Sequence, residues 1–396
     1  MAEEKEAGMK NITALGAVSF FTDFSTEMVL GVLPLFIISN LGATKAMLGA
    51  IEGSSELASY ALRMVSGSLS DRLGKRKVLI LAGYALSTAS KPFFAFAASW
   101  YHALALRLSD RVGKGVRTAP RDALIADSVP ESASGRAFGL HRTIDQMGAI
   151  AGPVVAFALL SVTDIRGVFL FSLVPGAIAV LVLVFFVREV AIKASARKAM
   201  LANVKSLVRS NRPFLILLVV SGIFSAGAFN FSFVLLRASE MGVQQNMVPL
   251  VYATINVAHT AVAYPSGRLA DRIGREKVLV IGYAVFAGSA AMMALPYGAA
   301  ATVYAYMVAI VYGVYAGIAE TLQRAVIPRY VAPESRGTAF GLYNLVAGSG
   351  FLAGGVAFGL LWDAAGIAAA SIYSIVLSIT AMAGMAVFIK SRRADP

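Results

Sequence analysis

The sequence predicts an all-α integral membrane protein with twelve transmembrane helices, and three observations support this prediction. First, 58% of the 396 residues are hydrophobic and 14% are charged, with a mean hydropathy of +0.71; a soluble domain has about 45–50% apolar and about 25% charged residues. Second, apolar stretches long enough to cross a bilayer follow one another along the chain. Third, the pattern repeats after about 200 residues. This composition excludes a soluble enzyme and a disordered protein.

Twelve apolar stretches have the length of about 20 residues that a spanning helix needs. They are predicted at residues 12–39, 45–70, 78–98, 101–125, 137–162, 167–187, 213–237, 246–267, 278–298, 301–327, 337–362 and 367–389. The one long polar break follows the sixth span. We therefore predict an N-terminal six-helix bundle at 1–187, a linker at 188–212 and a C-terminal six-helix bundle at 213–396.

Basic residues gather on one side of the predicted membrane: in the linker, in the loop after the second span and in the C-terminal tail. By the positive-inside rule, both termini and the linker are predicted to be cytoplasmic, in a multi-pass protein of the cell (inner) membrane. The net charge of +13 then reflects topology, and no nucleic-acid partner is expected. The acidic N-terminus lacks the pattern of a signal peptide.

Two segments recur in the two halves of the chain. GSLSDRLGKRKVLI at 67–80 and GRLADRIGREKVLV at 267–280 share eight of fourteen positions, and PESASGRAFGLHR from Pro130 is matched by PESRGTAFGLYN from Pro333. Parallel repeats of this kind are typical of two-bundle transporters, which bind substrate between the halves.

The first of these segments resembles the loop 2–3 signature of the major facilitator superfamily. The residues that carry this resemblance are Gly67, Leu69, Asp71, Arg72, Gly74, Lys75 and Arg76. Arg107, with Gly113 and Gly115, resembles the fourth-helix signature of that superfamily. The resemblance implies two pseudo-symmetric six-helix bundles, alternating access and a small-molecule cargo.

The fifth predicted span resembles the antiporter motif of the superfamily. Gly148, Gly152 and Pro153 follow Gly139 at the spacing of that motif, but Ala156 and Phe157 stand where the motif normally has a Gly-Gly pair. The chain thus looks most like the twelve-helix drug:proton antiporter branch, and the departure leaves the direction of transport open.

The repeated loop is expected to form a cytoplasmic gate. A carboxylate at the end of a span can pair with cations of the loop, while glycines allow close helix approach and a tight turn. The gate residues are predicted to be Gly67, Asp71, Arg72 and Gly74, with the counterparts Gly267, Asp271, Arg272 and Gly274. Asp122 or Asp127 is the expected partner in the first half.

Ionisable residues within spans are costly and mark function or mutual pairing. By helical rise, Glu27 lies level with Arg107, Asp23 level with Arg111 or Lys114, and Asp145 level with Lys114 and Arg117. We predict proton coupling on Asp23, Glu27 and Asp145, with the cationic partners Arg107, Arg111 and Lys114. A static ion-pair network is the alternative.

A substrate cavity is expected where the remaining charges and aromatic rings of the spans meet. Its predicted residues are Arg117, Arg142, His141, Phe229, Glu320 and Arg324. Aromatic residues at helical spacing are also compatible with plain packing. The chain has no cysteine and three scattered histidines, so no metal site and no cofactor are expected.

The sequence therefore predicts a secondary active transporter and no enzyme. The leading hypothesis is proton-coupled efflux of a small amphipathic compound. The alternative is a proton- or ion-coupled importer of an anionic metabolite, which the cationic fourth span would suit. The expected partners are the lipid bilayer, protons and a small-molecule substrate, and the expected working form is a monomer.

Overall fold

The computed structural model describes residues 2–130, 133–190, 211–295, 301–332 and 335–394, and these residues form helices and no strand. Most of the predicted linker lies outside them. In the first half the helices are α1 (Ala2–Leu30), α2 (Leu33–Leu35), η1 (Phe36–Asn40), α3 (Lys45–Leu73), α4 (Arg76–Ser90), η2 (Pro92–Phe96), α5 (Trp100–Asp127), α6 (Ser134–Leu159), α7 (Ile165–Phe171) and α8 (Leu173–Phe186). In the second half they are α10 (Arg212–Gly227), α11 (Phe231–Glu240), η4 (Gln245–Met247), α12 (Val248–Ile273), α13 (Arg275–Ala294), α14 (Ala301–Val326), η5 (Ile327–Arg329) and α15 (Arg336–Ala394).

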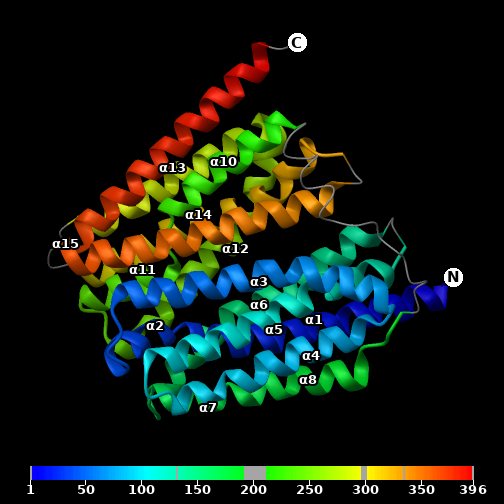
Figure 1. Ribbon diagram of the computed structural model, residues 1–396. Coiled ribbons are helices and arrows are strands. Elements are labelled where there is room, and N and C mark those ends of the chain that lie inside the picture. The colour runs from blue at the N-terminus through cyan, green and yellow to red at the C-terminus, as the bar shows by residue number, and fades with distance from the viewer. Residues whose placement is uncertain (1, 131–132, 191–210, 296–300, 333–334, 395–396) are drawn as a thin grey trace. The chain divides into compact units, whose positions relative to one another are not determined.

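The described helices account for the twelve predicted spans. Several spans are broken into consecutive pieces, such as α7 with α8 and α10 with α11. The last two spans are joined in the 59-residue α15, which is interrupted at Gly366 with φ 82° and ψ 172°. A left-handed backbone of this kind suits glycine, which has no Cβ. In Figure 1 the chain reverses within α15, where its colour passes from orange to red.

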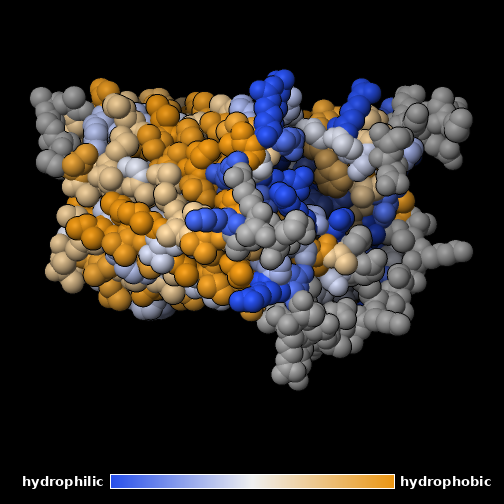
Figure 2. All heavy atoms as spheres, turned by 90° about the horizontal axis from the view of Figure 1, so that it is seen from above, coloured by the Kyte–Doolittle hydropathy of each residue, from blue (hydrophilic) through white to orange (hydrophobic). Residues whose placement is uncertain are grey.

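Eight helical stretches among the described residues are long and apolar enough to cross a membrane. One of them, Arg336–Lys390, has 55 residues and is long enough for two spans. The helices α3, α5 and α6 are not among the eight, because they carry charged side chains along their length. Figure 2 shows the matching surface: on the face in view, hydrophobic residues cover a broad area and hydrophilic residues gather towards one end.

The helices divide into two compact units. Unit 1 comprises Met1–Phe36 and Ala58–Lys198, and unit 2 comprises Ile37–Leu57 and Ala199–Pro396. Within unit 1, α1 packs on α6 and α8, and α4 packs on α5; within unit 2, α10 packs on α15 and α12 packs on α14. The first span thus packs on the fifth as the seventh packs on the eleventh, as a duplicated architecture requires.

Helix α3 belongs to both units, although the sequence assigns it wholly to the N-terminal bundle. Its first half packs in unit 2, where a Cβ added to Gly49 would lie 2.1 Å from the carbonyl oxygen of Gly355. The carboxylate of Asp363 accepts hydrogen bonds from the backbone N–H groups of Lys45 (3.3 Å) and Ala46 (3.1 Å). This carboxylate therefore caps the start of α3, where a helix has unpaired N–H groups and a partial positive charge.

Candidate functional site

The centre of unit 1 is built on the close packing of α1 against α6 (Figure 1). Two glycines of α6 face the backbone of α1. A Cβ added to Gly148 would lie 2.3 Å from the carbonyl oxygen of Phe20, and one added to Gly152 would lie 2.6 Å from that of Phe24. Small residues let the two backbones approach closely. The antiporter-like motif, in which Pro153 is also buried within α6, therefore forms this helix interface.

This interface brings together two carboxyl groups. From the rise of the helices, the sequence placed each of them level with cations. The side chains of Asp23 on α1 and Asp145 on α6 lie within hydrogen-bonding reach of each other. A carboxylate oxygen can only accept a hydrogen bond, so a bond between two carboxyl groups requires a proton on one of them. Lys114 and Glu27 interact electrostatically with Asp23. The comparison of helical rise correctly placed Lys114 near Asp23, but it did not reveal that Asp23 and Asp145 form a pair.

Asp145 also interacts with two cations that the sequence did not assign to it. The guanidinium of Arg142 donates to Asp145 at 3.0 Å, and Arg121 of α5 interacts electrostatically with it. The sequence placed Asp145 level with Lys114 and Arg117. Arg142 can reach Asp145 because it lies three residues earlier on the same helix, where side chains share a face.

A hydrogen-bonded cluster surrounds the pair on its α4 side. The hydroxyl of Ser19 lies 2.9 Å from Nε2 of His141 and 3.1 Å from the hydroxyl of Tyr84. Arg121 donates to Ser19 at 3.4 Å and pairs with Asp122 at 2.8 Å. Asp122, one of the two expected gate partners, thus pairs within α5. Arg117 is buried and its guanidinium lies 4.3 Å from the ring centroid of Tyr84.

A second charged cluster lies one to two turns further along α1. Asp110 accepts from Ser87 of α4 at 2.5 Å and from Arg107 at 3.1 Å. Lys91 at the end of α4 donates to Thr26 of α1 at 3.1 Å. The sequence placed Arg107 level with Glu27, and in the structure Arg107 pairs with Asp110 of its own helix. Lys91 was missed, although a lysine inside an apolar 21-residue span is itself a signal of function.

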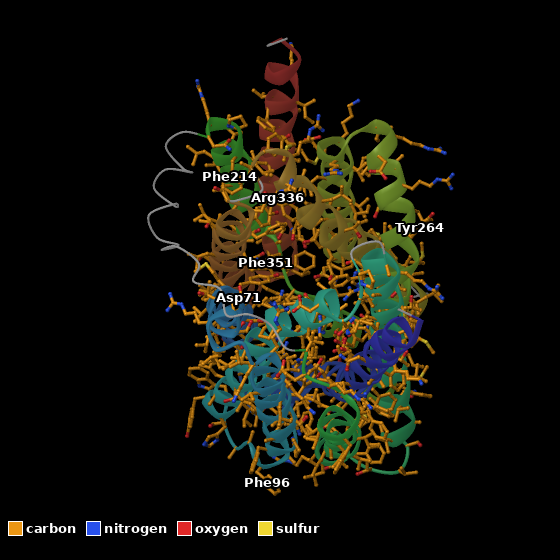
Figure 3. All side chains as sticks on the ribbon, turned by 90° about the vertical axis from the view of Figure 1, so that its right-hand side faces the viewer. Asp71, Phe96, Phe214, Tyr264, Arg336 and Phe351 are labelled. Atoms are coloured by element: carbon orange, nitrogen blue, oxygen red, sulfur yellow. The ribbon has the colours of Figure 1, made fainter. Side chains whose placement is uncertain are left out.

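The loop between α3 and α4 forms a clasp of ionic contacts, which we call the Arg76 clasp. Arg76 pairs with Asp127 at 2.6 Å and with Asp71 at 3.7 Å. Asp71 lies at the end of α3 that faces the viewer in Figure 3. Gly74 has φ 62°, and the tight turn that it makes carries the chain from α3 into α4. Of the two acids that the gate hypothesis left open, Asp127 is the one that contacts Arg76 of this loop.

Glu189 is a member of this region that sequence reasoning missed. Its carboxylate accepts hydrogen bonds from the backbone N–H groups of Arg76 (3.0 Å) and Lys77 (2.8 Å), at the start of α4. Glu189 follows α8 and is the second residue of the predicted linker. An acidic residue near a helix N-terminus in three dimensions leaves no pattern along the sequence, so only the structure could identify it.

Unit 2 repeats the loop but not its contacts. Gly274 has a positive φ of 99°, and the equivalent Gly74 also has a positive φ. The acid that forms an ion pair after this turn is Glu276, which binds Arg329 at 3.1 Å. A Cβ added to Gly267 would lie 3.7 Å from Thr321, and one added to Gly67 would lie 3.3 Å from Ala119. The helix approach at Gly67 is therefore tight, whereas Gly267 leaves ordinary van der Waals room for a Cβ.

We expect Asp127→Asn to slow turnover several-fold and to leave cargo affinity in detergent unchanged within about twofold. The reason is that Arg76 loses its shorter ionic contact, which lies at the C-terminal end of α5 and does not involve the carboxyl pair. Turnover in proteoliposomes and binding in detergent measure the two effects separately. The matched control is Asp122→Asn, which removes an acid of the same helix outside the clasp. A loss of affinity in folded Asp127→Asn protein would move this residue from the gate to the cargo site.

In unit 2, the predicted cavity residues Glu320 and Phe229 have different surroundings. Nε2 of His259 on α12 lies 3.0 Å from a carboxylate oxygen of Glu320 on α14. The side chain of Arg324 lies outside the described set. Phe229 is fully buried; its ring stacks on Tyr312 and packs at a tilt against Phe286. This is the environment of a core residue, so the aromatic side chains here form packing rather than an open wall.

Comparison with known proteins identifies the family to which this architecture belongs. The sequence model of the Major Facilitator Superfamily matches residues 15–355 and again 218–396. The MFS-type transporter MJ1317 of Methanocaldococcus jannaschii is 31% identical over 370 residues, covering 89% of this chain and 88% of that protein. The multi-drug resistance efflux pump PmrA of Streptococcus pneumoniae is 26% identical over 274 residues, covering 66% and 67%.

Solved structures share the fold at low sequence identity. The nucleoside transporter NupG has a TM-score of 0.77 at 16% identity, covering 96% of this chain and 98% of that one. A bacterial homolog to the human lysosomal transporter Spinster, in an inward-facing conformation, has a TM-score of 0.73 at 16% identity, covering 98% of each chain.

Proposed function

Since the chain belongs to the Major Facilitator Superfamily and is a multi-pass membrane transporter, we propose that it couples proton movement to efflux of a small amphipathic compound. The observation that carries this proposal is the close approach of the two carboxyl groups Asp23 and Asp145, which can share one proton in a hydrogen bond. The pair needs a proton to hold together, and it loses that bond when the proton leaves.

A carboxyl pair of this kind can act as the proton carrier of an antiporter. With the proton bound, α1 and α6 are joined by the shared hydrogen bond. Without it, two negative charges lie side by side and repel, and Arg142, Arg121 and Lys114 compete to stabilise them. Proton binding thus changes the contacts of two helices, which is the differential interaction that any coupled conformational change requires.

The direction of transport is supported by relatives. PmrA is a multi-drug resistance efflux pump, and the multidrug resistance protein MdtG of Salmonella typhi is 25% identical to this chain over 282 residues. The glycine motif at the α1–α6 interface supports the same direction, because it resembles the antiporter motif. We further propose that both termini are cytoplasmic and that the monomer, with halves at 1–187 and 213–396, is the working form.

A second candidate function, import of an anionic metabolite, is favoured by the charges of α5. Between residues 107 and 122 this helix carries five cations and two acids. The acids pair with Arg107 and Arg121, and the buried Arg117 lies over an aromatic ring. A bound anion would provide negative charge next to these cations.

Transport in proteoliposomes with imposed pH gradients tests both functions. A panel of small cations, anions and neutral amphiphiles is loaded on either side of the membrane. Efflux by antiport predicts accumulation driven by protons moving in the opposite direction, and import predicts accumulation with protons moving in the same direction. Exchange that ignores gradients of either sign would refute proton coupling.

A further inference from the structure

Lys91 is buried deep in unit 1, at the C-terminal end of α4. Its exposed fraction is 1%, and its Nζ donates a hydrogen bond to the hydroxyl of Thr26 at 3.1 Å. An ammonium has three N–H donors, and the Thr26 hydroxyl is the one acceptor that the described residues offer it. A buried ammonium that keeps two N–H groups without acceptors is costly, whereas a neutral amine has less to lose.

The charges around Lys91 come from two of the helices packed against it. Asp23 and Glu27 of α1 interact electrostatically with it, as do Asp110 and Arg117 of α5. The segment Leu173–Phe186 of α8 carries no charged residue. The guanidinium of Arg166 on α7 binds the backbone carbonyl oxygens of Ala95 and Ala97 in the segment after Lys91. Besides Arg117, α5 carries Arg107 and Arg111 as fixed cations.

The geometry places Lys91 between the carboxyl pair and Asp110. Thr26 follows Asp23 by three residues, which puts both on one face of α1 about 4.5 Å apart along its axis. Ser87 precedes Lys91 by four residues on α4, so these two also share a face, and Ser87 donates to Asp110. Lys91 therefore contacts α1 about one turn from Asp23, on the side of the pair that leads towards Leu30.

We propose that Lys91 is a second proton-carrying residue of the transport cycle, which exchanges a proton with the Asp23–Asp145 pair. This inference rests on the proposed proton coupling. In the transfer, an N–H bond of the ammonium breaks with its electron pair returning to nitrogen, and an O–H bond forms on a carboxylate oxygen of Asp23. An ion pair becomes two neutral groups. The arginines of this region cannot take this role, because a guanidinium keeps its proton in proteins.

Exchange of lysine for arginine separates a proton carrier from a static counter-ion. Lys91→Arg keeps the positive charge and removes the ability to release a proton, while Lys91→Met removes both. With the cargo found in the gradient experiment, we expect each variant to lose gradient-driven accumulation by at least about tenfold and to keep gradient-free counterflow within about twofold. The matched control, Lys390→Arg at the exposed end of α15, should keep both activities.

A measurement without cargo addresses the same point. The unfolding midpoint of purified protein is followed from about pH 6 to about pH 10, since a group that titrates in the folded protein makes this midpoint depend on pH. We expect Lys91→Arg and Lys91→Met to lose the same part of the wild-type pH dependence, and Lys390→Arg to retain it.

Two results would overturn the assignment. If folded Lys91→Arg retains more than about half of the gradient-driven accumulation, Lys91 is a static counter-ion of Asp110. If Lys91→Arg loses counterflow as well, the residue serves structure or cargo binding. Asp23→Asn, measured in parallel, keeps the two proposals apart: coupled transport in that variant refutes the proposed function itself, whereas coupled transport in Lys91→Arg alone refutes only the role of Lys91.

Discussion

Asp23→Asn is expected to abolish gradient-driven transport while counterflow and cargo binding remain. The amide of asparagine can still donate a hydrogen bond to the carboxylate of Asp145, so the α1–α6 contact is kept. An amide, however, neither takes up nor releases a proton at the pH values of a transport assay. We expect a loss of at least about tenfold in gradient-driven accumulation and less than about twofold in counterflow. Proteoliposomes measure both with the same preparation.

The matched control for this substitution is Asp164→Asn. Asp164 caps α7 by accepting from the N–H of Gly167 at 2.9 Å, and asparagine caps helices as well as aspartate does. This control changes the charge of unit 1 by the same amount outside the network, and it should transport normally. If Asp23→Asn, Glu27→Gln and Asp145→Asn all retain gradient-driven transport, proton coupling does not reside in these carboxylates, and the His259–Glu320 pair of unit 2 becomes the next site to test.

The sequence predicted the architecture because the signals for it are local. Apolar length defines the spans, and a repeat at an offset of 200 residues defines the two halves. Depth along a helix is also readable, because each residue advances the axis by about 1.5 Å. This arithmetic correctly placed Lys114 near Asp23.

What the sequence could not supply is which neighbour each charge faces. Asp145 has cations at the same depth on α5, yet it pairs with Arg142 of its own helix and with Asp23 of α1. That choice depends on the rotation of α6 about its axis and on how closely it approaches α1. Glu189 is a similar case, because its contact with the start of α4 joins residues 112 and 113 positions apart.

Gly148 is where this packing is decided, and Gly148→Ala is expected to destabilise the protein strongly. A Cβ at this position would lie 2.3 Å from the carbonyl oxygen of Phe20 and 3.0 Å from its Cα. The obstacle is backbone, so α6 must move away from α1 as a whole. Overpacking of this kind costs about 1–3 kcal/mol, and occasionally more. The gain of about 1 kcal/mol that alanine gives a helix over glycine does not offset it.

Gly139→Ala is the matched control, because it is the same exchange in the same helix. A Cβ at Gly139 would meet no heavy atom within 4 Å, so this variant should keep the benefit of alanine and unfold at an equal or higher temperature. The unfolding midpoint in detergent and the monodisperse fraction after purification measure the difference. The two variants are thus expected to change stability in opposite directions.

The same pair of variants connects the glycine motif to coupling. In the fraction of Gly148→Ala that folds, α6 stands further from α1, which lengthens the contact between Asp145 and Asp23. We therefore expect folded Gly148→Ala protein to lose a much larger fraction of its gradient-driven transport than of its counterflow. This is the same pattern as in Asp23→Asn. Equal stability of the two alanine variants would contradict the close α1–α6 contact. Normal coupling in a destabilised Gly148→Ala protein would mean that the motif serves packing alone.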